Sequence, residues 1–272
     1  MRSFIITVVL VLAGPIARAD KVQRARAIFA QSCATCHVLG HAEGQLPHHA
    51  GIVDLTMVYR KLGERLPKNL LLKGEEDHGK EEAKHDHDHG EYDPHVWLGI
   101  PQAIAMVEMI RDELTKVDGA HAEDYEKNAE EYVKKLKKLQ SDGQAKLTDK
   151  NDRKIIAFHE SLGYFAKSFE LNILDAIEVA PGQEPSPGHM KELVEKCKKE
   201  NVRVIAVEPQ YPKGTSAEVL QREVKGLEFA VVDPLETAAD KDVKDDQKEL
   251  KDKGWYEKKM KQNLDALAKS LP

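Results

Sequence analysis

The chain has 272 residues, of which 32% are charged, and its formal net charge at pH 7 is −6. A modest acidic charge without a basic stripe argues against a nucleic-acid-binding protein. The three cysteines are an odd number and do not make a disulfide framework. This length suits one two-lobed domain or two small domains.

Residues 1–19 have the pattern of a secretory signal peptide. Arg2 supplies a positive charge, residues 4–12 are mostly apolar, and Ala17-Arg18-Ala19 matches an A-x-A cleavage site. The apolar run is too short for a good membrane span. No cysteine follows the cleavage site, where bacterial lipoproteins carry their anchor. We therefore predict a soluble periplasmic protein without a lipid anchor.

The next segment, residues 20–52, contains a motif typical of covalent haem attachment. Cys33 and Cys36 flank two residues and His37 follows them, which is the C-x-x-C-H pattern of c-type haem. The two thiols bond the vinyl groups, and His37 becomes the proximal iron ligand. We predict a short helical segment that binds haem c.

The rest of this region leaves alternatives open. The second axial ligand is Met57 or one of His41, His48 and His49. The cysteine pair is also compatible with a thioredoxin-like pair, a simple disulfide, or a zinc site that includes His41.

Residues 75–92 form a histidine-rich, acidic segment that precedes a better-defined histidine. Neutral imidazole and carboxylate groups suit a divalent cation such as zinc. The segment has no apolar periodicity, so we predict a loop that collects metal. His95 differs, because it follows Asp93-Pro94 and precedes a patterned helix. The histidines are His78, His85, His87, His89 and His95.

Two helices follow. Pro101 opens the first, and Asp118-Gly119 ends it. The second starts at about His121, with a break or kink expected at Ser141-Asp142-Gly143. We expect the region 121–153 to link two lobes.

Residues 154–272 alternate between strands and helices. Such alternation with continuous apolar strands predicts a mostly parallel sheet covered on both faces. The expected strands are 154–159, 172–179, 202–207 and 227–232, and the expected helices are 160–170, one that follows the 181–187 loop, 216–224, and a final one that carries Trp255 to Leu267.

Polar residues stand at the ends of three of these strands. Ligands bind at the carboxyl ends of parallel strands, where His159, Glu208 and Asp233 are expected. Two histidines and a carboxylate from separate elements are typical of a fixed zinc site. We therefore predict that these strand ends and His95 converge on a metal ion.

The motifs in this order resemble those of zinc/manganese ABC-importer solute-binding proteins, from about residue 53 to the C-terminus. They are Asp93-Pro94-His95-Val96-Trp97-Leu98, Phe158-His159-Glu160-Ser161-Leu162-Gly163-Tyr164-Phe165, Pro185-Ser186-Pro187, Val207-Glu208-Pro209-Gln210 and Val232-Asp233-Pro234-Leu235.

The resemblance implies two α/β lobes joined by a long helix, with the metal held between them. It implies that His95 and His159 are imidazole ligands, that Asp233 is the carboxylate ligand, and that Glu208 lines the cleft. Members of the family begin with a strand and a loop that supplies another histidine. Here the haem motif stands in that region, so the N-terminal lobe (53–120) is expected to be truncated. The fourth ligand would be His48, His49, a histidine of the 75–92 segment, or water.

The expected function is an exported zinc-binding protein of the importer type, with covalent haem c and a membrane permease as partner. We predict a monomer that binds zinc or manganese and is not an enzyme, since Glu160 is the only obvious base near the site. The alternative is a c-type cytochrome for electron transfer or redox or metal sensing, built on a degenerate binding-protein scaffold.

Overall fold

The computed structural model describes residues 65–73, 92–178, 184–209, 216–235 and 254–272. The expected signal peptide, the Cys-x-x-Cys-His motif, the histidines before residue 92, and Met57 all lie outside these ranges. The same is true of most of the charged segment between the last strand and the last helix.

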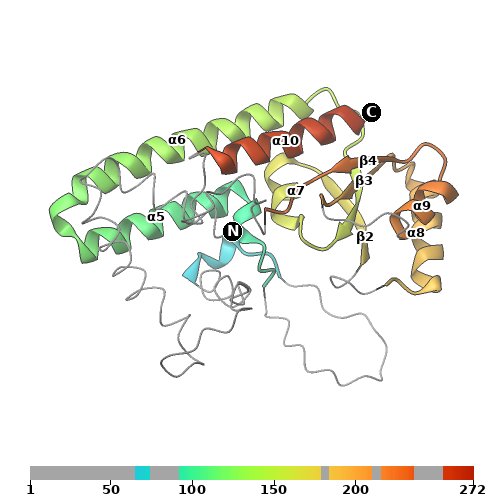
Figure 1. The fold of residues 1–272 in the computed structure, drawn as a ribbon, viewed down its shortest axis with the longest axis horizontal. Helices are drawn as coiled ribbons and strands as arrows, with labels where there is room; N and C mark the ends of the chain where they lie inside the picture. Colours follow the sequence, from blue (N-terminus) through green and yellow to red (C-terminus); the bar gives the residue numbers. More distant parts are fainter. Residues whose placement is uncertain (1–64, 74–91, 179–183, 210–215, 236–253) are drawn as a thin grey trace, which may run out of the picture.

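A four-stranded parallel sheet with the order β2-β1-β3-β4 confirms the predicted α/β class (Figure 1). The continuous apolar run of β1 explains its place inside the sheet, because a strand covered on both faces has no polar side. The strands are β1 (Lys154–His159), β2 (Asn172–Glu178), β3 (Val204–Val207) and β4 (Glu228–Val231).

Side chains alternate along these strands between two separate hydrophobic layers. Ile155 and Ala157 of β1 belong to the layer that contains α5, α6, α7 and α10. Ile156 and Phe158 of the same strand belong to the other layer, with α8 and α9. This period of two is the geometry of a strand, so one apolar run supplies both layers.

The helices pack against the two faces of the sheet in two groups, one in each hydrophobic layer. Figure 1 shows α6 and α10 side by side along one edge of the molecule, with α5 next to them, while α8 and α9 lie beyond the sheet. The helices are α5 (Ile100–Val117), α6 (Ala122–Leu147), α7 (Gly163–Phe169), α8 (Pro187–Glu200), α9 (Ser216–Glu223) and α10 (Trp255–Ser270), with short 3-10 turns η2 (Lys68–Leu70), η3 (Val96–Leu98) and η4 (Gly119–His121).

The expected break at residues 141–143 is wrong, because α6 continues through them to Leu147. Gly143 is buried within the helix. A side chain there would meet Phe169 and Leu264, so the glycine allows close packing of α6 on α7 and α10.

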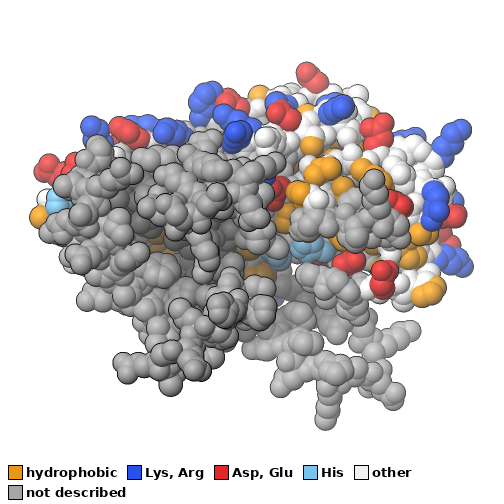
Figure 2. All heavy atoms as spheres, viewed as in Figure 1, with side chains coloured by type: hydrophobic (Ala, Val, Ile, Leu, Met, Phe, Trp, Pro, Cys, Tyr) orange, Lys and Arg blue, Asp and Glu red, His pale blue; other side chains and the backbone are white. Residues whose placement is uncertain are grey.

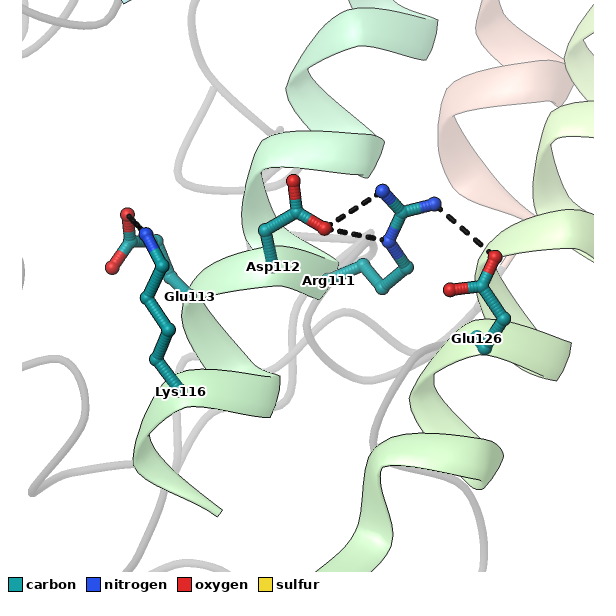
Figure 3. Close-up of polar contacts among 5 residues, drawn as sticks. All are labelled: Arg111, Asp112, Glu113, Lys116 and Glu126. Carbon is teal, nitrogen blue, oxygen red and sulfur yellow. Dashed lines mark hydrogen bonds and ion pairs between the residues drawn. The ribbon is translucent and has the colours of Figure 1, made fainter. Parts of the chain in front are cut away.

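A two-lobed molecule with a sheet in each lobe was expected. Within the described ranges the sheet β2-β1-β3-β4 is the only one, and residues 53–64 and 74–91 of the expected first lobe lie outside them. The helices α5 and α6 also carry a set of exposed ion pairs (Figure 3), in which Arg111 contacts both Asp112 and Glu126. Exposed pairs of this kind add little stability.

None of the helices in the described ranges is both long and apolar enough to cross a membrane.

Glu257, in the first turn of α10, gives a pH-dependent prediction. Burial raises the pKa of its carboxyl above the ordinary value. A carboxyl with a higher pKa in the folded state costs stability as the pH rises from its unfolded pKa through its folded pKa. Glu257→Gln should therefore raise the melting temperature at pH 8 and change it little at pH 4. Thermal unfolding at several pH values measures this. The exposed Glu192→Gln is the control, and an equal effect of Glu257→Gln at all pH values would contradict the prediction.

Candidate functional site

Asp93 fixes the imidazole ring of His95. One carboxylate oxygen, Oδ1, lies 2.8 Å from both the backbone N and the ring Nδ1 of His95. The backbone of Asp93 is itself held, because its N–H donates to the Leu72 carbonyl and its carbonyl accepts from the Tyr164 hydroxyl, each at 3.0 Å. Burial raises the pKa of Tyr164 to about 12, so the hydroxyl stays protonated as a donor. The position of His95 is therefore set by its own turn and by α7.

Glu208 stands in the same relation to His159. His159 is the last residue of β1 and is 6% exposed. Its Nδ1 atom contacts the Oε1 atom of Glu208, which directly follows β3. Since β1 and β3 are parallel neighbours, their carboxyl ends lie together and bring this pair into contact.

The two histidines face each other. Their ring centroids are 6.1 Å apart, with an edge-on arrangement of the rings. Two imidazoles that share one zinc ion through bonds of about 2.0–2.1 Å have ring centres about 5–6 Å apart. A small movement therefore suffices for His95 and His159 to share an ion. Histidine side chains are visible near the middle of the face in Figure 2, beside a group of hydrophobic side chains.

A carboxylate on Nδ1 has a chemical consequence for each ring. The carboxylate favours the tautomer with the proton on Nδ1. The Nε2 atom then has a free lone pair with which it can bind a metal ion. Carboxylate–histidine pairs of this kind orient zinc-binding histidines and raise their basicity. His95 and His159 thus offer nitrogen donors that suit a metal ion such as zinc.

Asp233 follows the end of β4 by two residues, close to its expected place, but its carboxylate is engaged elsewhere. Oδ1 accepts a hydrogen bond from the backbone of Leu235 at 2.9 Å, and Oδ2 accepts one from Lys259 of α10, also at 2.9 Å. The Asn263 side chain donates to the Asp233 carbonyl and accepts from its N–H, both at 2.8 Å. Helix α10 therefore holds both the backbone and the charge of Asp233.

Trp97 connects the His95 segment to the Asp233 turn. Its indole N–H donates to the carbonyl of Pro234 at 2.8 Å, and its ring lies 5.4 Å from that of His95. Nonetheless, no group of three or more His, Cys, Asp or Glu side chains within the described ranges lies close enough to hold a metal ion. The structure thus brings together the two predicted histidines, and the Asp233 turn is a neighbour whose carboxylate does not complete their set.

Three residues of this arrangement were missed from the sequence. Asp93 precedes His95 by two residues, and the Asp-Pro-His order was a usable signal for its role. Trp97 was seen only as part of a motif. Lys259 lies among many lysines near the C-terminus, where spacing alone does not distinguish it. The predicted Cys33, Cys36 and His37 lie outside the described ranges.

Residues 38–270 match the family model described as zinc-uptake complex component A, periplasmic (ZnuA). The zinc-binding protein AdcA of Streptococcus pyogenes serotype M3 (strain ATCC BAA-595 / MGAS315) is 34% identical over 177 residues, 62% of this chain and 34% of that protein. The high-affinity zinc uptake system protein ZnuA of Bacillus subtilis (strain 168) is 36% identical over 180 residues, 66% of this chain and 53% of that protein. The matches thus span about a third to a half of the length of these relatives.

A solved structure gives a fold match at a similar level of identity. The Zn(II)-bound ZnuA-like domain of Streptococcus pneumoniae AdcA has a TM-score of 0.53 and 31% identity, covering 68% of this chain and 66% of that chain. The family model spans far more than half of the 272 residues, and the α/β fold agrees with this solved relative. The chain therefore belongs to the ZnuA family, the periplasmic components A of zinc-uptake complexes.

Proposed function

We propose that this chain binds a zinc ion through His95, His159 and Asp233 and delivers it to a membrane permease. The observation that carries the proposal is the facing pair of histidines, each with a carboxylate at Nδ1. The zinc-related names of the matched family and relatives support the same cargo. The metal is a cargo in this proposal, so the chain acts as a solute-binding protein and not as an enzyme.

Binding at this site requires a further step for the carboxylate. Asp233 must join the two histidines, since it does not complete their set in this structure. Its turn is already tied to the His95 segment through Trp97 and Pro234. A fourth ligand comes from water, His48, His49 or a histidine of the 75–92 segment.

The carboxylates behind the histidines provide a test of the proposed site. Glu208→Gln should weaken zinc binding by about 10-fold, because changes to groups that orient metal-bound histidines cost about 10–100-fold. Glu192→Gln, on the exposed face of α8, should leave the affinity unchanged. Equilibrium dialysis against a zinc buffer measures both variants beside the wild type. Failure of the wild type to bind zinc, or equal loss in both variants, would argue against the site.

The histidine-rich segment is proposed to raise the zinc concentration near the site. An isolated antiparallel bridge joins Lys73 to Tyr92, and Tyr92 is three residues before His95 in the sequence. Deleting residues 75–91 should reduce zinc uptake when zinc is limiting and leave it unchanged when zinc is abundant. Unchanged uptake at limiting zinc would contradict this role.

A second function, covalent haem binding, is proposed for the N-terminal segment. The Cys33–His37 motif lies before the residues that match the family model, which begin at residue 38. We propose an exported protein with a haem c segment at 20–52 and a shortened first lobe. In this view the alternative role as an electron-transfer or sensing cytochrome uses the same haem. An absorbance spectrum after maturation with the haem-attachment machinery tests it, since a chain without haem has no Soret band.

A further inference from the structure

The ion pair between Asp233 and Lys259 opposes the role proposed for Asp233. The Lys259 ammonium donates to Oδ2 at 2.9 Å, and the two side chains are only 17% and 19% exposed. A carboxylate bound to an ammonium group offers less of its charge to a second cation, because the two cations repel each other. We propose that Lys259 is an internal competitor that occupies Asp233 and is displaced when zinc binds. This inference rests on the proposed zinc function.

The lysine is placed for this contact by its helix. Lys259 lies one turn after Trp255 and one turn before Asn263 on α10. Its ammonium is 5.7 Å from the centre of the Trp255 ring, and Asn263 clamps the backbone of Asp233. The contact is therefore held from both sides, unlike an exposed pair between two mobile side chains.

Among the described residues the Asp233 carboxylate accepts hydrogen bonds from Leu235 and Lys259, and the lysine is the partner able to leave. The Leu235 N–H at Oδ1 belongs to a turn in which Leu235 has a φ of 57°. That turn is fixed by Trp97 through Pro234 and by Asn263. A lysine side chain, in contrast, has four rotatable bonds and moves without a change in the backbone.

Exchange of the ammonium for zinc at Oδ2 has two consequences. Zinc binding breaks the ion pair between Asp233 and Lys259. The chain therefore binds zinc less tightly than a chain with the same ligands but without Lys259. The energy of the ion pair is regained on release, because coupling between two ligands of one group is reciprocal. Lys259 would thus lower the affinity and favour release to the permease.

The test removes the charge of Lys259 and measures zinc affinity by competition with a chelator. Lys259→Gln and Lys259→Met should bind zinc about 5-fold more tightly, which is the upper end of what a single exposed ion pair contributes and suits a pair that is held in place by its surroundings. Lys259→Arg, which retains the charge, should stay near the wild type. Lys261→Gln, an exposed change of equal charge on the same helix, should have no effect.

A double-mutant cycle separates this role from a merely structural one. In an Asp233→Asn background, the further change Lys259→Gln should no longer tighten zinc binding, because the competed carboxylate is gone. Thermal unfolding without zinc shows that each variant is folded. Unchanged or weaker zinc binding in both folded Lys259 variants would overturn the competitor role while leaving the zinc site intact. A wild-type chain that binds no zinc would overturn the proposed function, and the competitor role with it.

Discussion

Replacing His95 and His159 together with alanine is expected to weaken zinc binding by more than about 100-fold. Even residues that only orient metal-bound histidines contribute about 10–100-fold each, and these two are the expected ligands themselves. Both imidazoles are oriented by carboxylates and face each other at 6.1 Å. Their loss leaves Asp233, which is paired with Lys259, as the remaining predicted ligand of the described ranges. Equilibrium dialysis of the double variant against buffered zinc measures the effect.

A matched control exists elsewhere in the chain. His121 also has a carboxylate at its Nδ1 atom, 3.0 Å from both oxygens of Asp118. It lies at the turn between α5 and α6, outside the proposed site. His121→Ala should therefore bind zinc with wild-type affinity. Full affinity in the His95→Ala/His159→Ala variant, with a loss in His121→Ala, would move the metal site to a different part of the molecule.

The two histidine variants also differ in their expected effects on stability. His159 is 6% exposed at a strand end, whereas the His95 side chain is 17% exposed. His159→Ala leaves the Glu208 carboxylate in a mostly buried place without its imidazole, and removing one partner of a buried pair is costly. Thermal unfolding of the single variants is therefore part of the experiment, and zinc affinity is compared only among folded proteins.

The sheet and the positions of two of the proposed ligands were predictable because their signals are local. The two inner strands are short apolar runs, β1 from Ile155 to Phe158 and β3 from Val204 to Val207. Parallel pairing then places His159 and Glu208 at one edge without further information. His95 was predictable from its motif, and its contact with Asp93 spans only two residues.

The environment of Asp233 was not predictable in the same way. Its partners Lys259 and Asn263 are 26 and 30 residues away in the sequence. The intervening segment gives no pattern that fixes which face of α10 turns toward the strand end. The position of Asp233 after β4 therefore identified it as a candidate ligand. It did not identify Lys259 as the cation that its carboxylate contacts.

Gly143 shows a conflict between a local and a tertiary signal. Glycine in a helix interior costs about 1 kcal/mol relative to alanine, which is why a break was expected at this point. The helix α6 instead passes through it, and an added Cβ would lie 2.6 Å from Phe169 Cε1 and 2.7 Å from Leu264 Cδ1. Both neighbours are buried, with exposed fractions of 0% and 2%. Packing therefore decides the structure here, against the helix propensity.

Gly143→Ala is accordingly expected to destabilise the protein, although alanine is the better helix former. Overpacking a buried site costs about 1–3 kcal/mol, which exceeds the gain of about 1 kcal/mol in helix propensity. Gly143→Leu should be more severe still, because its larger side chain has to displace α7 or α10. Urea unfolding followed by circular dichroism measures the free energy of unfolding of each variant.

Gly119 provides the control for this prediction. A Cβ at Gly119 meets no atom within 4 Å, so Gly119→Ala should change the free energy of unfolding by less than about 0.5 kcal/mol. Comparing the free energies of unfolding of the two variants separates the effect of contact with Phe169 and Leu264 from the general effect of replacing glycine. A Gly143→Ala variant more stable than the wild type would mean that these side chains shift at little cost. In that case helix propensity, and not close packing, would dominate at this position.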